Sequence, residues 1–277
     1  MCVFPIYKNF IYENGKMVID WSSSGVRFGN NPCVVRLKCG KCSECMRQRA
    51  SEWALRIMQE SSLYKDNCMI TLTYRDTDGE LHKCDIQKFV KRLRKKLVPK
   101  KIRVFYCGEY GSKGGRPHFH IILFNYKPQD LVFFFSEDGH SVYKSNFLEQ
   151  TWGLGYVSVV DLTFYTAFYC SLYMQKYNNV SNKVQKPFLG MSNRPGIGFE
   201  FARQVDYTSD AIFFKGKSYK VPRYYDKVNF RDNSILESNV KRNRLFQIML
   251  KELPLSEQFK LQDYKREQEA VFEKYLL

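Results

Sequence analysis

The sequence predicts an α+β domain in which an antiparallel sheet of about five strands is covered by flanking helices. Segments with helical spacing alternate with short β-branched segments in the order helix, strand, helix, strand, strand, strand, helix, an order typical of this class. Of the 277 residues, 44% are hydrophobic and 16% are aromatic, which supplies a buried core and excludes a mainly disordered chain. The longest apolar runs, residues 119–124 and 131–135, are far shorter than the roughly 20 residues of a membrane-spanning helix.

The first predicted elements are two helices with a strand between them. A moderately amphipathic helix is expected over residues 46–63, and a β-branched strand over 69–74 is followed by a turn at 76–79. Apolar residues then recur at helical spacing over 85–97, where Asp85 is the expected N-cap.

Three further strands and a helix follow. Strands are expected over 102–107 and 118–125, joined by a glycine-rich link, and another over 156–162, before a helix over 164–177. Residues 127–155 show no regular period and are expected to form an insertion. The glycines of the link are Gly108, Gly111, Gly114 and Gly115.

The chain is expected to have three parts. Residues 1–45 form an N-terminal segment with a cysteine cluster, residues 46–180 form the main domain, and residues 181–277 form a C-terminal extension. The extension is mixed at first and then helical over 235–277, with an interruption near Pro254.

The charge of the chain indicates a polyanionic partner. Against 28 acidic residues stand 44 Lys and Arg, a net charge of +16, which favours nucleic-acid binding over a basic protein that is merely soluble. The positive run at 91–96, continued by Lys100 and Lys101, forms either a solvated helix face or a surface that follows a DNA backbone. Residues 1–5 do not begin a signal peptide, so the protein is expected to stay inside a cell.

A pair of histidines is the first candidate for chemistry. His118 and His120 are two of only four histidines, and on a strand they face the same side while Phe119 and Ile121 enter the core. Glu109 precedes His118 by nine positions, and a tight hairpin would bring its carboxylate beside both rings. Two imidazoles and one carboxylate suit Mn²⁺ or Mg²⁺ and tolerate Zn²⁺; the alternative is an incidental pair on a half-exposed strand.

Tyrosines form a stripe along the predicted helix over 164–177. Tyr165, Tyr169, Tyr173 and Tyr177 recur at every fourth position and therefore share one helix face. Such a stripe is often simple packing. Lys176 lies three positions after Tyr173, and its ammonium could stabilise the phenolate that a tyrosine nucleophile requires.

The nine cysteines are an odd number, and three of them, Cys39, Cys42 and Cys45, lie within seven residues. This spacing suits a reducing compartment and a tetrahedral metal. A closed site needs a fourth ligand, for which Cys33 and Cys2 are the candidates, so the cluster holds either a structural Zn²⁺ or free thiols. The cysteines expected as simple core thiols are Cys68, Cys84, Cys107 and Cys170.

Seven segments together carry a family resemblance over roughly residues 33–226. The chain resembles the replication initiation proteins of small single-stranded DNA phages of the microvirus type, particularly the gokushovirus branch, within the HUH endonuclease superfamily. The segments are CGKCSEC at 39–45, TLTY at 71–74, GEYG at 108–111, GRPHFH at 115–120, YCSLYMQK at 169–176, MSNRPGIG at 191–198 and VPRYYD at 221–226.

The resemblance implies an HUH/RRM-like nuclease fold and the initiation of rolling-circle replication. It implies that the histidine pair, with Glu109 as the matching acidic residue, holds a metal that polarises a phosphodiester. Tyr169 and Tyr173, with Lys176 beside them, match the tyrosines that attack phosphorus and leave a 5′-phosphotyrosine and a free 3′-hydroxyl primer. The implied partners are single-stranded DNA at a replication origin and the host replication machinery, in the host cytoplasm.

Two other functions stay open from the residues alone. One is a single-stranded nucleic-acid-binding protein with a zinc knuckle and no chemistry, in which the histidine pair is incidental. The other is a zinc hydrolase or deaminase that uses the same histidines. It has little support, because the sequence contains no His-X-Glu followed by Pro-Cys-X-X-Cys.

Overall fold

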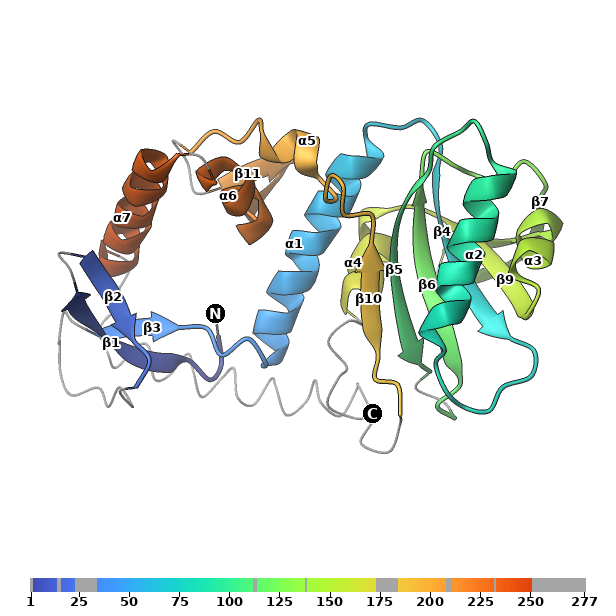
Figure 1. The fold of residues 1–277 in the computed structure, drawn as a ribbon, viewed down its shortest axis with the longest axis horizontal. Coiled ribbons are helices and arrows are strands. Elements are labelled where there is room, and N and C mark those ends of the chain that lie inside the picture. Colours follow the sequence, from blue (N-terminus) through green and yellow to red (C-terminus); the bar gives the residue numbers. More distant parts are fainter. Residues whose placement is uncertain are drawn as a thin grey trace. The chain divides into compact units, whose positions relative to one another are not determined.

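The computed structural model describes residues 2–13, 16–22, 34–111, 114–137, 139–172, 184–207, 211–231 and 233–250. The chain divides into two compact units (Figure 1), and each is described by itself. One unit comprises Met1–Gln48 with Glu252–Leu277, and the other comprises Arg49–Lys251.

The smaller unit contains a three-stranded antiparallel sheet that the sequence pattern did not predict. Its order is β2-β1-β3, with β1 at Ile6–Glu13, β2 at Lys16–Asp20 and β3 at Val34–Leu37. Helix α1 begins shortly after β3 and runs over Ser43–Ser61, three residues earlier than expected at its start. The cysteine cluster lies between the end of β3 and the first turn of this helix.

The larger unit is built on a sheet of seven strands within the described residues, in the order β10-β5-β6-β4-β9-β8-β7. All of its pairings are antiparallel, so the α+β class is confirmed, with a larger sheet than expected. The strands are β4 Asn67–Tyr74, β5 Arg103–Tyr110, β6 Pro117–Phe124, β7 Leu131–Glu137, β8 His140–Ser145, β9 Gly155–Asp161 and β10 Phe188–Met191.

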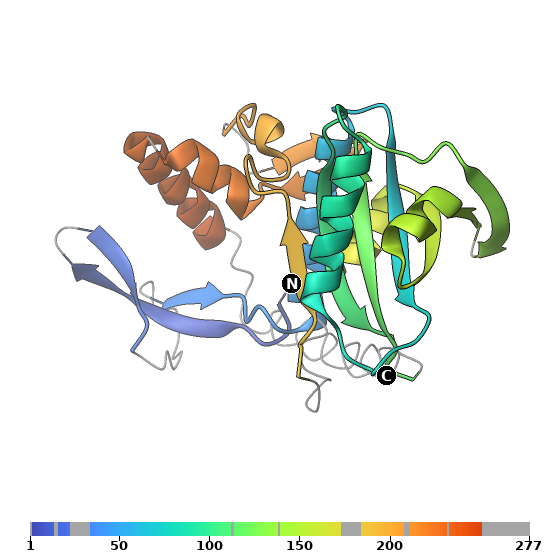
Figure 2. The ribbon, with the colours of Figure 1, turned by 45° about the vertical axis from the view of Figure 1, so that its right-hand side comes forward.

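Helices cover both faces of this sheet, and Figure 2 shows α2 in front of it and α1 behind it. Helices α2 (Lys83–Lys96) and α3 (Asn146–Trp152) pack on one face, where Phe119 lies in their core. Helices α1 and α4 (Phe164–Leu172) pack on the other face, where Ile122 lies in theirs. Residues of β6 therefore serve opposite cores, as the period of two requires.

Residues 127–155 are not an irregular insertion, and that prediction was wrong. They form β7, β8 and α3 and extend the main sheet. The apolar run of β7 gave no alternating pattern because the strand lies at the sheet edge, where Phe133 and Phe134 stay 58% and 51% exposed. An edge strand without a buried face carries no period that a sequence pattern could reveal.

Two details of α2 also differ from expectation. The N-cap is His82 rather than Asp85, since Asp85 lies in the first turn and accepts a hydrogen bond from the Tyr74 hydroxyl at 3.0 Å. Cys84 is exposed rather than a core thiol, whereas Cys68, Cys107 and Cys170 are buried as predicted.

The C-terminal part of the larger unit packs against α1. Arg56 of α1 donates from Nε and Nη2 to the Ile197 carbonyl at 3.1 and 2.9 Å, and Glu60 accepts from the Gly198 N–H at 2.8 Å. Two of the family segments, 191–198 and 221–226, therefore belong to a scaffold around α1. The elements here are α5 Phe199–Ala202, β11 Ala211–Phe214, β12 Lys217–Lys220, α6 Arg223–Phe230 and α7 Ser234–Leu250.

Candidate metal centre and nucleophile helix

The hairpin of β5 and β6 brings the predicted metal ligands together. Across this pair Glu109 lies opposite His118, and Cys107 lies opposite His120. The turn closes with a hydrogen bond from the Gly111 N–H to the Arg116 carbonyl at 2.9 Å. Gly114 and Gly115 adopt φ values of 76° and 61°, which only glycine adopts readily. The glycine-rich link thus fixes the register that places the carboxylate beside the rings.

One carboxylate oxygen meets both imidazoles. Glu109 Oε1 lies 2.8 Å from His118 Nε2 and 3.0 Å from His120 Nε2. The two rings stand almost perpendicular, at 88°, with centroids 4.9 Å apart. Glu109 and His120 are only 3% and 6% exposed, while His118 is partly exposed. The three side chains therefore form a half-open cluster at the sheet surface.

The electrostatics of the cluster suit a metal. Burial opposes ionisation of Glu109, but hydrogen bonds and charge from the two histidines outweigh it and lower the pKa of this carboxyl below 4.5. Burial also lowers the pKa of His120 below 6.5, against the opposing effect of Glu109. At neutral pH the carboxylate is therefore charged and the His120 ring neutral, which are the forms that ligate metals.

An orphaned oxygen provides a test of whether a metal fits. Within the described part of the chain, Glu109 Oε2 is buried and has no hydrogen-bond partner. A buried carboxylate oxygen without a partner is costly, and a cation held with His118 and His120 would supply one. Two imidazole nitrogens and a carboxylate are a donor set that Mn²⁺ and Zn²⁺ accept, and Mg²⁺ accepts it with added oxygen ligands. The residues therefore fit a divalent ion.

The other nitrogen of each ring is also held. His120 Nδ1 lies 2.9 Å from the hydroxyl of Thr71, which pairs with His120 across β4 and β6. His118 Nδ1 lies 3.1 Å from the Arg116 carbonyl. Such outer contacts orient a ligand ring. Sequence reasoning did not single out Thr71, although the alternation of Thr71 and Thr73 on β4 was a usable signal.

Helix α4 carries a tyrosine to the cluster. The Tyr169 ring lies against His120, with centroids 5.8 Å apart at 81°. Two buried residues, Ala167 and Cys170, fix the helix against the sheet, and Cys170 Sγ lies 3.7 Å from Cys107 Sγ of β5. The other predicted members of this site, Tyr173, Lys176 and Tyr177, lie outside the described residues.

A row of stacked rings continues from the cluster along the surface. Tyr169 stacks with Tyr165 at a centroid distance of 6.4 Å, and Tyr165 stacks with His140 of β8 at 5.4 Å and an interplanar angle of 13°. Tyr165 is 57% exposed. The tyrosine stripe is therefore not packed into the core at this point, and it presents a flat aromatic surface to solvent.

The basic helix α2 lies on the other face of the sheet. Its core residues join the cluster that contains Phe119, whereas the histidines point to the face of α1 and α4. Arg92 donates to the Thr151 and Trp152 carbonyls, each at 2.9 Å, and Lys96 donates to the Thr151 hydroxyl at 3.0 Å. Part of the positive run thus stabilises the end of α3.

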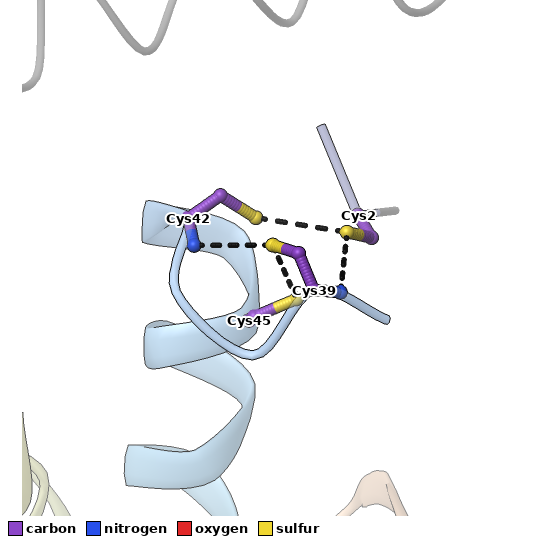
Figure 3. A group of neighbouring side chains, drawn as sticks. All are labelled: Cys2, Cys39, Cys42 and Cys45. Atoms are coloured by element: carbon purple, nitrogen blue, oxygen red, sulfur yellow. Dashed lines mark hydrogen bonds between the residues drawn. The ribbon is translucent and has the colours of Figure 1, made fainter. Parts of the chain in front are cut away.

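The cysteine cluster gains a fourth member in the smaller unit. The sulfurs of Cys39, Cys42 and Cys45 gather with that of Cys2 (Figure 3), all within 4.8 Å of one another. Cys2 is one of the two candidates for a fourth ligand, and the other, Cys33, lies outside the described residues.

Comparison with known proteins identifies the family. A family model of replication-associated proteins of the ORF2 type matches residues 67–178, from β4 past the end of α4. Replication-associated protein VP4 of Bdellovibrio phage phiMH2K is 31% identical over 81% of this chain and 75% of its own length. The chain belongs to the family of phage replication-associated proteins. The predicted family is thus confirmed.

Two further relatives of this phage replication-associated protein agree. Replication-associated protein ORF2 of Spiroplasma virus 4 is 30% identical over 82% of the chain and 79% of its own length. Replication-associated protein ORF4 of Chlamydia phage 1 is 31% identical over 68% of the chain and 52% of its own length. No solved structure matches the chain. Among the described residues, no helix has the length and apolar character needed to span a membrane.

Proposed function

We propose that this protein initiates rolling-circle replication as a metal-dependent nickase and strand transferase of single-stranded DNA, acting with the host replication machinery in the host cytoplasm. The observation that carries the proposal is the contact between two groups of residues. The buried cluster of Glu109, His118 and His120 has a donor set for a divalent ion, and the Tyr169 ring lies against one of its histidines.

Each group of residues has a separate role in the proposed reaction. Glu109, His118 and His120 would hold Mg²⁺ or Mn²⁺, which when bound neutralises charge on the non-bridging oxygens of the scissile phosphate. A tyrosine of the α4 stripe attacks phosphorus. The bond from its Oη to phosphorus forms, its proton passes to solvent, the bond from phosphorus to the 3′ oxygen breaks, and that oxygen takes a proton from solvent.

Two tyrosines four positions apart allow repeated transfer. While Tyr169 or Tyr173 holds the 5′ end as a phosphotyrosine, the other cleaves the next phosphodiester, and the released 3′-hydroxyl can rejoin the first strand. Lys176, three positions after Tyr173, would stabilise the phenolate. The position of Tyr169 beside His120 supports its membership of the pair.

Single-stranded DNA is the proposed substrate because of charge and aromatic surface together. The chain carries a net charge of +16, and the exposed stack of His140 and Tyr165 leads toward Tyr169. Unpaired bases stack on such rings, whereas paired bases in a duplex cannot. The stack would therefore hold the strand near the nucleophile.

Incubation with circular single-stranded DNA and Mn²⁺ or Mg²⁺, followed by a denaturing gel, tests the proposal. The expected product is a covalent complex that is lost when Tyr169→Phe and Tyr173→Phe are combined. Tyr165→Phe, on the same helix face, is the matched control and should keep the complex. Binding of DNA without any covalent complex would instead support a non-catalytic binding protein.

A further inference from the structure

The spacing of the four clustered sulfurs matches a tetrahedral metal site. Cys39 Sγ lies 3.9 Å from Cys45 Sγ, and Cys42 Sγ lies 3.9 Å from Cys2 Sγ. A tetrahedron of thiolates around Zn²⁺ at about 2.3 Å has edges of about 3.8 Å, because an edge is about 1.63 times the bond length. A disulfide requires about 2.05 Å, so these are reduced thiols at ligand spacing.

The chain reaches this arrangement through one turn and one helix start. Gly40 has a φ of 74°, a left-handed conformation that lets the backbone fold back between Cys39 and Cys42. The Cys42 carbonyl accepts the Met46 N–H at 2.9 Å, so α1 starts here. Cys45 lies three positions further, on the same face of the first turn. All three sulfurs therefore point to one place (Figure 3).

Backbone N–H groups point at the sulfurs, as they do where a thiolate carries charge. The N–H groups of Lys41 and Cys42 donate to Cys39 Sγ at 3.4 and 3.3 Å. The Cys39 N–H donates to Cys2 Sγ at 3.3 Å. Hydrogen bonds of this kind favour the charged form of their acceptor. The positive end of the α1 dipole acts in the same direction on Cys42 and Cys45.

The cluster also occupies the place of a hydrophobic core. Cys2, Cys42 and Cys45 are buried, and the described residues that pack with them are Val3 and the partly buried Cys39. One valine cannot stabilise a unit of this size by burial alone. A metal bound by all four thiolates would supply that stability, because the binding free energy of a structural zinc is available to folding.

We propose that Cys2, Cys39, Cys42 and Cys45 bind one structural Zn²⁺ that ties residue 2 to the first turn of α1. Four thiolates and no open position make this a closed site, suited to structure rather than to catalysis. Soft sulfur ligands select Zn²⁺ over Mg²⁺ or Mn²⁺, which separates this site from the one proposed at Glu109, His118 and His120. Cys2, 37 positions from Cys39, takes the place of Cys33 as the fourth ligand.

Metal content of the full-length protein purified under reducing conditions tests the assignment. A background of His118→Ala with His120→Ala removes zinc from the other cluster, and in it one Zn²⁺ per chain is expected. Adding Cys2→Ser or Cys42→Ser should lower the zinc affinity at least tenfold. Cys84→Ser, at an exposed cysteine on α2, and Cys33→Ser should leave it unchanged.

Cobalt provides a readout that does not depend on the variants folding. Co²⁺ added to the metal-free protein should give the intense thiolate-to-cobalt absorption of a four-sulfur tetrahedral site, and Zn²⁺ should displace it. Amide exchange should then slow at Cys39, Cys42 and Met46 on adding Zn²⁺, but not in β4 or β6. A protein without zinc and without the cobalt spectrum, or full zinc affinity in Cys2→Ser, would overturn the proposal.

Discussion

Thr71→Val should weaken metal binding without touching a metal ligand. The Thr71 hydroxyl lies 2.9 Å from His120 Nδ1, on a ring that is 6% exposed. Valine matches threonine in shape but cannot form this hydrogen bond, so the ring nitrogen loses its partner in a place that water reaches poorly. The His120 ring then turns more freely, and its Nε2 is less well oriented toward the ion.

The size of the effect follows from the lost hydrogen bond. A buried polar atom left without a partner costs about 1–3 kcal/mol, which corresponds to about 5-fold to 140-fold in an equilibrium constant at about 1.4 kcal/mol per tenfold. Loss of an outer contact to a ligating histidine costs about 10-fold to 100-fold in metal affinity. The two ranges overlap, and a Mn²⁺ affinity weaker by about 10-fold to 100-fold is expected for Thr71→Val.

Electron paramagnetic resonance of free Mn²⁺ during titration of the full-length protein measures this affinity directly. Thr73→Val is the matched control, because Thr73 lies on the same strand but its hydroxyl donates to the Tyr156 carbonyl at 3.3 Å. It should bind Mn²⁺ within about threefold of the parent protein, since no outer contact to a ligand is lost. An unchanged affinity in Thr71→Val, with the parent's urea midpoint, would refute the role of Thr71.

Three other predictions concern the ligands, the aromatic stack and pH. His118→Ala and His120→Ala should each abolish nicking, whereas Phe119→Leu should leave it largely intact; near-normal activity in either histidine variant in the gel assay would exclude the metal centre. Tyr165→Ala should weaken single-stranded DNA binding by about 1–3 kcal/mol, measured by fluorescence anisotropy, while Tyr165→Phe should not, and equal losses in both would argue against stacking. Burial holds the pKa of His120 below 6.5, so the unfolded chain takes up this proton first as pH falls. The metal-free protein should therefore lose stability to urea below about pH 6.5, and the loss should be smaller in His120→Asn; an identical pH dependence in both would contradict this.

The metal cluster was predictable because its determinants are local. A period of two aligns His118 with His120, and the glycine-rich link returns the chain so that Glu109 meets them. Both signals lie within the short stretch from Glu109 to His120. The same local logic found β4, β5, β6 and β9, whose apolar residues alternate or form short buried runs.

Contacts between distant segments were not predictable in this way. β10 pairs with β5 from 80 positions along the chain, as in Phe188 with Gly108, and no period in either strand specifies the partner. Cys2 joins the cysteine cluster from the first residues of the chain for the same reason. Thr71 gained its meaning only when β4 paired with β6, because a threonine on a strand is otherwise ordinary.

The central claim is that a tyrosine of the α4 stripe becomes linked to DNA, and mass spectrometry of the covalent complex tests it most directly. After digestion of protein and DNA, the account predicts a nucleotide joined through its 5′ phosphate to Tyr169 or Tyr173, with a free 3′-hydroxyl on the other cleavage product. A linkage through a 3′ phosphate, or to a residue outside this pair, would contradict it.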